Sequence, residues 1–138
     1  MGREAEAAVV KRIEDADQFD ELVAESQSKL VVIDLFAEWC GPCSALTPTM
    51  NKMMVDYDRS EDRIVLATAC IDKLHEKIQA ALPTDTQVKL ETNGCHPVFA
   101  VFRFGAVIGM VTGADSPALL SLVDINIPAA PAAAAAAE

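Results

Sequence analysis

The chain is organised around Val31-Val32-Ile33-Asp34-Leu35-Phe36-Ala37-Glu38-Trp39-Cys40-Gly41-Pro42-Cys43, an apolar run that ends in two cysteines separated by two residues. Its β-branched residues predict a buried strand, and Gly41-Pro42 then breaks the strand and starts a helix. Such a turn puts Cys40 at a helix N-terminus, where unpaired N–H groups and the helix dipole favour the reactive thiolate. Cys43, one turn deeper, can attack a mixed disulfide formed at Cys40. The spacing predicts a reversible dithiol/disulfide pair, with metal binding as the alternative.

Strands and helices alternate along the rest of the chain. Apolar runs predict strands at 7–13, 64–71, 98–102 and 106–111. Helical spacing predicts a helix capped by Asp17, one running from Cys43 to about Asp58 and kinked at Pro48, one over 74–82, and one that starts with Ser116 as cap and Pro117 at its first position. Together with the central run, this order predicts an α/β fold: a mixed five-stranded sheet with four helices on its two faces.

Composition narrows the class of protein. The 138 residues suit one domain of ordinary size, which we expect to span 1–126, followed by a disordered Ala/Pro-rich tail at 127–138. A formal net charge of −10 disfavours nucleic acid and anionic membranes as partners. No run is long and apolar enough for a membrane span, and the N-terminus lacks a signal-peptide core. These features predict a soluble protein of a reducing compartment, the cytoplasm.

The four cysteines in such a compartment do not predict a structural disulfide framework. Only Cys40 and Cys43 are paired by spacing. The two histidines, His75 and His96, are far apart in the sequence, so no zinc or other metal site is expected. Cys70 lies within an apolar strand and is expected to be an inert core residue.

Trp39-Cys40-Gly41-Pro42-Cys43 resembles the active-site signature of the thioredoxin family. The resemblance covers about residues 8–126 and extends to other marked positions of that family: the buried aspartate, the proline of the active-site helix, the cis-proline facing the dithiol and the glycines of the last hairpin. These positions are Asp34, Pro48, Pro97, Gly105 and Gly113.

The resemblance implies the thioredoxin fold and protein-disulfide oxidoreductase chemistry. Cys40 is then the nucleophile and Cys43 the resolving thiol, with no cofactor beyond the redox-active disulfide between them. Asp34 would relay the proton that Cys43 loses; the alternative is an aspartate that only fixes the end of its strand. Thioredoxins often place a lysine beside this aspartate, and here the aligned residue is Thr68. We therefore expect a strongly raised pKa for Asp34.

The remaining site residues are expected to bind substrate. The resemblance implies this role for Trp39, Gly41, Pro42, His96, Pro97 and Gly113. His96 is unusual for the family; it would stabilise the Cys40 thiolate or select acidic substrates, or else is an exposed loop residue. Cys95 is a secondary thiol or a small exposed residue. Residues 84–94 read as an insertion, either a tolerated loop or a partner contact.

The segment 105–120, Gly-Ala-Val-Ile-Gly-Met-Val-Thr-Gly-Ala-Asp-Ser-Pro-Ala-Leu-Leu, resembles the thioredoxin-like light chains of ciliary outer-arm dynein. That resemblance implies a redox-active subunit in the axoneme of a cilium or flagellum, with the dynein heavy chain or other subunits as partners and protein disulfides as substrates. The alternative is a free cytosolic thioredoxin recycled by an NADPH-dependent thioredoxin reductase. A structural subunit whose dithiol is a relic is a third reading.

Overall fold

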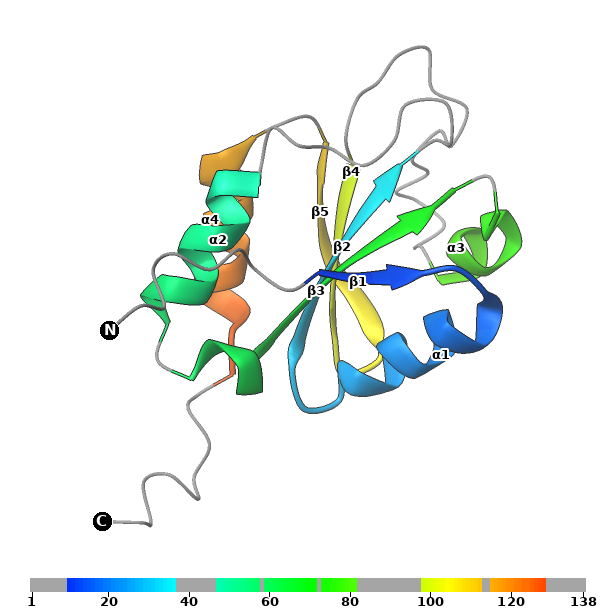
Figure 1. Cartoon of the computed structure of the whole chain (residues 1–138), viewed down its shortest axis with the longest axis horizontal. Coiled ribbons are helices and arrows are strands. Elements are labelled where there is room, and N and C mark those ends of the chain that lie inside the picture. Colours follow the sequence, from blue (N-terminus) through cyan, green and yellow to red (C-terminus); the bar gives the residue numbers. More distant parts are fainter. Residues whose placement is uncertain are drawn as a thin grey trace.

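The structure, a computed structural model, describes residues 10–36, 47–57, 59–71, 73–81, 98–112 and 115–128. In these ranges the chain forms five strands and four α-helices, with a short 3-10 helix at Ser60–Asp62 (Figure 1). The predicted order of elements is therefore confirmed. In chain order the elements are β1 (Val10–Ile13), α1 (Ala16–Glu25), β2 (Leu30–Phe36), α2 (Thr47–Asp56), β3 (Ile64–Cys70), α3 (His75–Ala81), β4 (Val98–Arg103), β5 (Ala106–Thr112) and α4 (Ser116–Asn126).

Strand β2 lies at the centre of the sheet, whose order is β1-β3-β2-β4-β5. It pairs in parallel with β3 and antiparallel with β4, so the sheet is mixed, as predicted. Every residue from Leu30 to Leu35 is at most 2 % exposed. A strand covered on both faces favours a continuous β-branched and apolar run over an alternating one, which explains the sequence of this segment.

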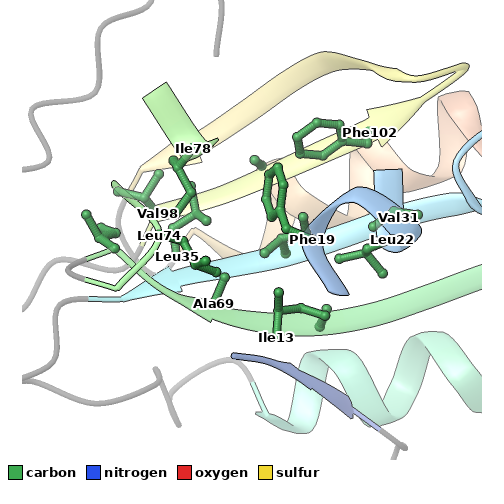
Figure 2. Close-up of a cluster of buried hydrophobic side chains, with 14 of the residues drawn as sticks. Ile13, Phe19, Leu22, Val31, Leu35, Ala69, Leu74, Ile78, Val98 and Phe102 are labelled. Carbon is green, nitrogen blue, oxygen red and sulfur yellow. The ribbon is translucent and has the colours of Figure 1, made fainter. Parts of the chain in front are cut away.

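Different helix pairs cover the two faces of the sheet (Figure 1). Ile33 belongs to the hydrophobic cluster under α1 and α3, whereas Val32 belongs to the cluster under α2 and α4. In the first cluster, the rings of Phe19 and Phe102 meet edge to face with centroids 6.2 Å apart (Figure 2). Because side chains alternate along a strand, the even-numbered residues of β2 face α2 and α4.

Helix α1 is capped by Asp15, so the prediction of Asp17 as its cap is wrong. Asp15 has extended backbone angles, φ −144° and ψ 172°, and its Oδ1 accepts a hydrogen bond from the Gln18 N–H at 2.8 Å. A cap needs this extended backbone and an unpaired helix N–H within reach. Asp17 already lies in the first helical turn, where its charge suits the positive end of the helix dipole.

Helix α4 is capped by Asp115, one residue before the predicted cap Ser116. The Asp115 Oδ1 accepts a hydrogen bond from the Ala118 N–H at 3.1 Å, and Pro117 lies in the first turn as expected. The Ser116 hydroxyl instead lies 2.9 Å from the Thr49 hydroxyl. This hydrogen bond joins α4 to α2, which explains why a serine that looked like a cap has another role.

Helix α2 ends at Asp56, two residues before the predicted end. Met50 and Met53 are buried in the cluster beneath it. Pro48 lies in the first turn that the structure describes. The predicted kink involves residues before 47, which lie outside the described residues.

The turn between β4 and β5 consists of Phe104 and Gly105, with φ of 59° and 80°. Positive φ at both central residues is the geometry of a type I′ turn, whose twist suits a two-residue hairpin. Ser26, which is fully buried after α1, holds this turn: its Oγ accepts a hydrogen bond from the Gly105 N–H at 2.8 Å, and its carbonyl accepts one from the Phe104 N–H at 2.6 Å.

The described chain continues two residues beyond α4. Ile127 packs against the cluster under α2 and α4, and its N–H donates to the Val123 carbonyl at 2.8 Å. The Pro128 carbonyl accepts a hydrogen bond from Arg63 Nε at 2.9 Å. The expected domain boundary at 126 thus coincides with the end of α4, although these two residues still contact the domain. The rest of the predicted tail, 129–138, lies outside the described residues.

The helices of the described ranges are short. The longest, α4, has 11 residues. None of the helices in these ranges has the length and apolar character needed to cross a membrane.

Candidate functional site: a buried carboxyl at the end of the central strand

Asp34 is a charged-type residue in the interior of the sheet. It is 1 % exposed, and among the described residues only Ser26 and Ser60 are other buried polar side chains. As an even-numbered residue of β2, it faces α2 and α4. A carboxyl is rarely buried to this extent in a structural position, because burial disfavours its charged form. The predicted burial of Asp34 is therefore confirmed, and Asp34 becomes the first residue of the candidate site.

The strand register fixes the neighbours of Asp34. It pairs with Thr68 of β3 in parallel and with Phe99 of β4 in antiparallel register. The alignment that placed Thr68 beside Asp34 is confirmed. At this position β3 therefore offers a half-buried hydroxyl residue instead of an ammonium group. Phe99 is fully buried and closes the other side with an aromatic ring.

The predicted dithiol lies in the connection from β2 to α2. Strand β2 ends at Phe36 and α2 is described from Thr47. Trp39, Cys40, Gly41, Pro42 and Cys43 lie between these two residues and outside the described part of the chain. Strand β2 ends two residues after Asp34, and the connection that follows leads to α2, which covers the face of the sheet to which Asp34 belongs.

Three segments that are far apart in the sequence meet at one end of the sheet. Leu35 pairs with Val98, the first residue of β4, and Val98 pairs with Thr112, the last residue of β5. This row therefore contains the described residues that precede or follow three undescribed segments, which begin at 37, end at 97 and begin at 113. Cys95, His96, Pro97 and Gly113 are themselves outside the described residues. Their described neighbours bring the ends of their segments to the end of β2 from which the dithiol segment departs.

Cys70 is a free thiol at the same end of the sheet. It is the last residue of β3, is 5 % exposed and pairs in register with Phe36. Its burial agrees with the predicted core role. Its closeness to the end of β2 was not anticipated from the sequence, although the parallel pairing of the two apolar strands 30–36 and 64–70 would have indicated it.

The described residues contain no group of three or more His, Cys, Asp or Glu side chains that could hold a metal ion. Among the described residues at this end of the sheet, Asp34 offers a carboxyl, Cys70 a thiol, and Thr68 and Thr112 hydroxyls. A buried carboxyl with a pKa raised by burial can accept and return a proton near neutral pH. Among the described residues, Asp34 is therefore the candidate for proton transfer.

The family model described as Thioredoxin matches residues 9–124. Thioredoxin-T of Drosophila melanogaster is 28 % identical over 116 residues, which are 84 % of this chain and 66 % of that protein. The 16 kDa dynein light chain of the flagellar outer arm of Chlamydomonas reinhardtii is 32 % identical over 101 residues, 70 % of this chain and 59 % of that protein. The chain thus spans under two thirds of the length of these two relatives.

Mouse thioredoxin is 30 % identical over 111 residues, which are 80 % of this chain and 92 % of that protein. Among solved structures, a thioredoxin from Nicotiana alata superposes with a TM-score of 0.65 at 22 % identity, covering 89 % of this chain and 96 % of that one. This likeness shows that the five-stranded sheet and its four helices have the thioredoxin fold. The buried Asp34, the strand order and the match over 9–124 lead to one conclusion: the chain belongs to the thioredoxin family.

Proposed function

We propose that this chain exchanges thiols and disulfides through Cys40 and Cys43, as a redox-active light chain of ciliary outer-arm dynein. The observation that carries the chemical part is the buried Asp34 carboxyl in the central strand of a thioredoxin-family domain, six residues before Cys40. The subunit part is supported by the 32 % identity to the flagellar dynein light chain.

The exchange reaction takes two steps. In the first, the Cys40 thiolate attacks one sulfur of a substrate disulfide, forms a mixed disulfide and releases the other substrate sulfur as a thiolate. In the second, the Cys43 thiolate attacks Cys40 Sγ, and the second substrate thiolate leaves. The substrate disulfide gains two electrons and the protein dithiol loses two. A thioredoxin reductase that uses NADPH returns the Cys40–Cys43 disulfide to the dithiol.

Asp34 acts on the second step in this proposal. Cys43 must lose a proton before it attacks, and a buried carboxylate on the adjoining face accepts that proton and returns it to the leaving substrate thiolate. Burial raises the pKa of a carboxyl towards the range in which it can do so. Thr68 adds no positive charge that would counter this effect.

The residues around the dithiol are proposed to hold the substrate. Trp39, Gly41 and Pro42 supply an apolar surface, and His96, Pro97 and Gly113 contribute from the segments before β4 and after β5. The register that joins Leu35, Val98 and Thr112 supports this grouping. Cys95 is a secondary thiol beside it, and the insertion 84–94 is a partner contact.

The alternative to the light chain is a free cytosolic thioredoxin. The 92 % coverage of mouse thioredoxin favours it, because the chain matches nearly the whole of that protein. In the light-chain reading, the partner is the dynein heavy chain or another outer-arm subunit, and the location is the axoneme.

Reduction of insulin disulfides by dithiothreitol tests the chemistry. We expect the parent chain to accelerate the reaction, Cys40→Ser to show only the background rate, and Cys43→Ser to accumulate a mixed disulfide that mass spectrometry detects. Cys70→Ala is the matched control and should keep the parent rate. A parent chain that does not exceed background would contradict the proposed exchange.

Sedimentation of outer-arm dynein extracted from native cilia tests the subunit role. The chain should travel with the dynein particle, and Cys40→Ser expressed in its place should still do so. If the chain is found solely as a free 14.7 kDa monomer, the free thioredoxin is the correct reading.

A further inference from the structure

The turn between β4 and β5 holds a phenylalanine in a backbone conformation that few side chains adopt. Phe104 has a φ of 59° at the first central position of the type I′ turn. Asparagine and aspartate suit this position, whereas a bulky side chain is strained there. Phe104 belongs to neither hydrophobic cluster and is 67 % exposed. Its ring therefore serves neither the core nor the turn, and strain of this kind indicates a function outside the fold.

Hydrogen bonds hold the strained turn in place. The Phe104 N–H donates to the Ser26 carbonyl at 2.6 Å, and the Gly105 N–H donates to Ser26 Oγ at 2.8 Å. Arg103 Nη1 donates to the carbonyls of Ser26 and Gln27 at 3.0 and 2.9 Å. These four bonds tie the turn to the segment between α1 and β2. The backbone that carries the exposed ring is thus fixed in advance, which lowers the entropy cost of binding a partner.

The Arg103 guanidinium lies over the Phe104 ring, with Cζ 3.9 Å from the ring centroid. A guanidinium has five N–H donors, and Nη1 uses its two on the carbonyls of Ser26 and Gln27. None of the described residues accepts a hydrogen bond from Nε or Nη2 of Arg103. These two nitrogens form one edge of the guanidinium, and such an edge binds a carboxylate through two parallel hydrogen bonds.

The charges around the turn favour an anionic group at this edge. The segment between α1 and β2 and the β4–β5 hairpin contain two charged side chains, Lys29 and Arg103, although the whole chain has a net charge of −10. Neighbouring elements carry carboxylates: Glu25 at the end of α1 pairs with Lys11 at 2.9 Å, and Glu61 lies on the 3-10 helix, where its carbonyl accepts a hydrogen bond from Lys29 Nζ at 3.3 Å. No carboxylate of the described part of the chain forms an ion pair with Arg103.

We propose that Arg103 and Phe104, which we call the hairpin site, bind a partner protein at a segment that presents a carboxylate beside an apolar side chain. The carboxylate accepts hydrogen bonds from Nε and Nη2 of Arg103, and the apolar side chain packs on the exposed part of the Phe104 ring. Two parallel charge-assisted bonds select a carboxylate over an amide. Arginine and aromatic side chains are also the types that carry much of the binding energy in protein interfaces.

The hairpin site lies at the end of the sheet opposite to the dithiol segment. Val31, near the start of β2, pairs with Phe102, so the turn after Arg103 lies beyond the start of β2. The connection that contains Cys40 follows the other end of β2, after Phe36. The partner therefore binds away from the end where disulfide exchange is proposed, and this inference does not depend on that chemistry.

Titration of the ¹⁵N-labelled full chain with a synthetic peptide tests the proposal. The probe is a short peptide of alternating aspartate and leucine with blocked termini, and its matched control has asparagine in place of aspartate. An ionic strength of about 0.15 M screens the repulsion between the probe and a chain of net charge −10. We expect the largest shifts at Arg103 Nε–H and at the amides of Phe104 and Gly105. The asparagine peptide should bind about tenfold more weakly or worse.

Phe104→Asn separates binding from turn stability, because the two should change in opposite directions. Asparagine is favoured in a type I′ turn, so the free energy of unfolding in urea should equal or exceed that of the parent, while the affinity for the aspartate peptide falls about tenfold. Arg103→Lys keeps the positive charge but loses the two-donor edge, and it should weaken the affinity about fivefold or more. Val55→Asn is the matched control: Val55 is 53 % exposed on α2, and this variant should keep the affinity within about twofold.

The proposal is overturned if the parent chain binds neither peptide or binds both equally, or if Phe104→Asn keeps the parent affinity. A Phe104→Asn variant that is less stable than the parent would instead assign the ring to the fold. A parent dimer in sedimentation equilibrium that Phe104→Asn dissociates would mean that a second copy occupies the hairpin site. Peptide binding that strengthens about tenfold when residues 129–138 are deleted would mean that this segment of the same chain does.

Discussion

At the scale of single residues, the pairing of Asp34 with Thr68 leads to a prediction about the Asp34 pKa. The carboxyl is 1 % exposed, and its partner in register on β3 is a threonine. We expect burial to hold the Asp34 pKa well above the ordinary value of about 3.9. Thr68→Lys should lower it by about one unit or more, because an ammonium group beside the carboxyl favours its charged form.

Carboxyl ¹³C chemical shifts measured across the pH range report this pKa directly. Thr68→Met lengthens the side chain without adding charge and should leave the pKa raised. The expectation fails if Asp34 in the parent chain ionises near pH 4, or if the lysine and methionine variants shift it equally.

Tyr57 offers a second test at this scale. Partial burial raises its pKa above 10.0, and the hydrogen bond that its hydroxyl donates to Asp124 at 2.9 Å raises it further. The folded state therefore holds the phenol proton more tightly than the unfolded state does. The resulting stability is fully present below about pH 10 and is lost as the pH rises through the folded pKa. Urea unfolding at about pH 9 and pH 11 should show a larger loss for the parent than for Tyr57→Phe; equal losses would mean that Tyr57 has an ordinary pKa.

At the scale of elements, the Leu122 side chain of α4 covers Gly109 of β5. In Gly109→Ala the new Cβ would lie 2.8 Å from the Leu122 Cδ atoms, so the leucine side chain must move. We expect a loss of about 1–2 kcal/mol in the free energy of unfolding, the usual cost of overpacking.

A double-mutant cycle separates this overpacking from other effects of the alanine. With Leu122→Ala the space above Gly109 opens, and adding Gly109→Ala should then cost less by about 0.5 kcal/mol or more. Urea denaturation of the four proteins gives the coupling. Purely additive losses would show that Gly109 is required for some reason other than contact with Leu122.

The elements themselves were predictable because their signals are local. The β-branched run of β2 and the helical spacing of α1 and α4 identify the elements without reference to the rest of the chain. The caps were placed one or two residues too late, since Asp15 and Asp17 are the same residue type and only the backbone angles distinguish them. The latch between Ser26 and the hairpin was not anticipated, because no local pattern encodes hydrogen bonds between residues 79 positions apart.

One part of the candidate site, the pair Asp34 and Thr68, was predictable because both residues lie in apolar strands. Asp34 and Thr68 were placed together by aligning two apolar strands, and the register confirms them. The position of Cys70 beside Phe36 depends on where β3 ends. The apolar run predicts that end one residue too late, at 71 instead of Cys70. The roles of Cys40, Cys43, His96 and Pro97 stay predictions.

At the scale of the whole molecule, the net negative charge affects how the chain associates with other proteins. A chain with a net charge of −10 and a pI of about 4.5 is drawn to a basic partner, and salt screens that attraction. If the chain is a docked subunit, its release from isolated axonemes should increase as the ionic strength of the extraction buffer is raised at constant pH. Immunoblotting of the soluble and pelleted fractions measures the release, and Cys40→Ser should follow the parent. A retained fraction that does not change with salt would indicate that docking is essentially apolar.

The hydrogen bond from Arg63 to the Pro128 carbonyl has a practical use. Arg63 directly precedes β3, at the end of the sheet opposite to Phe36 and Cys70. Pro128, the last described residue, therefore lies at the end of the sheet opposite to Phe36 and Cys70. A fluorescent protein or gold-binding tag joined after Pro128 should consequently mark where the chain resides in a cell, because the tag starts at the opposite end of the sheet from the segment with Cys40.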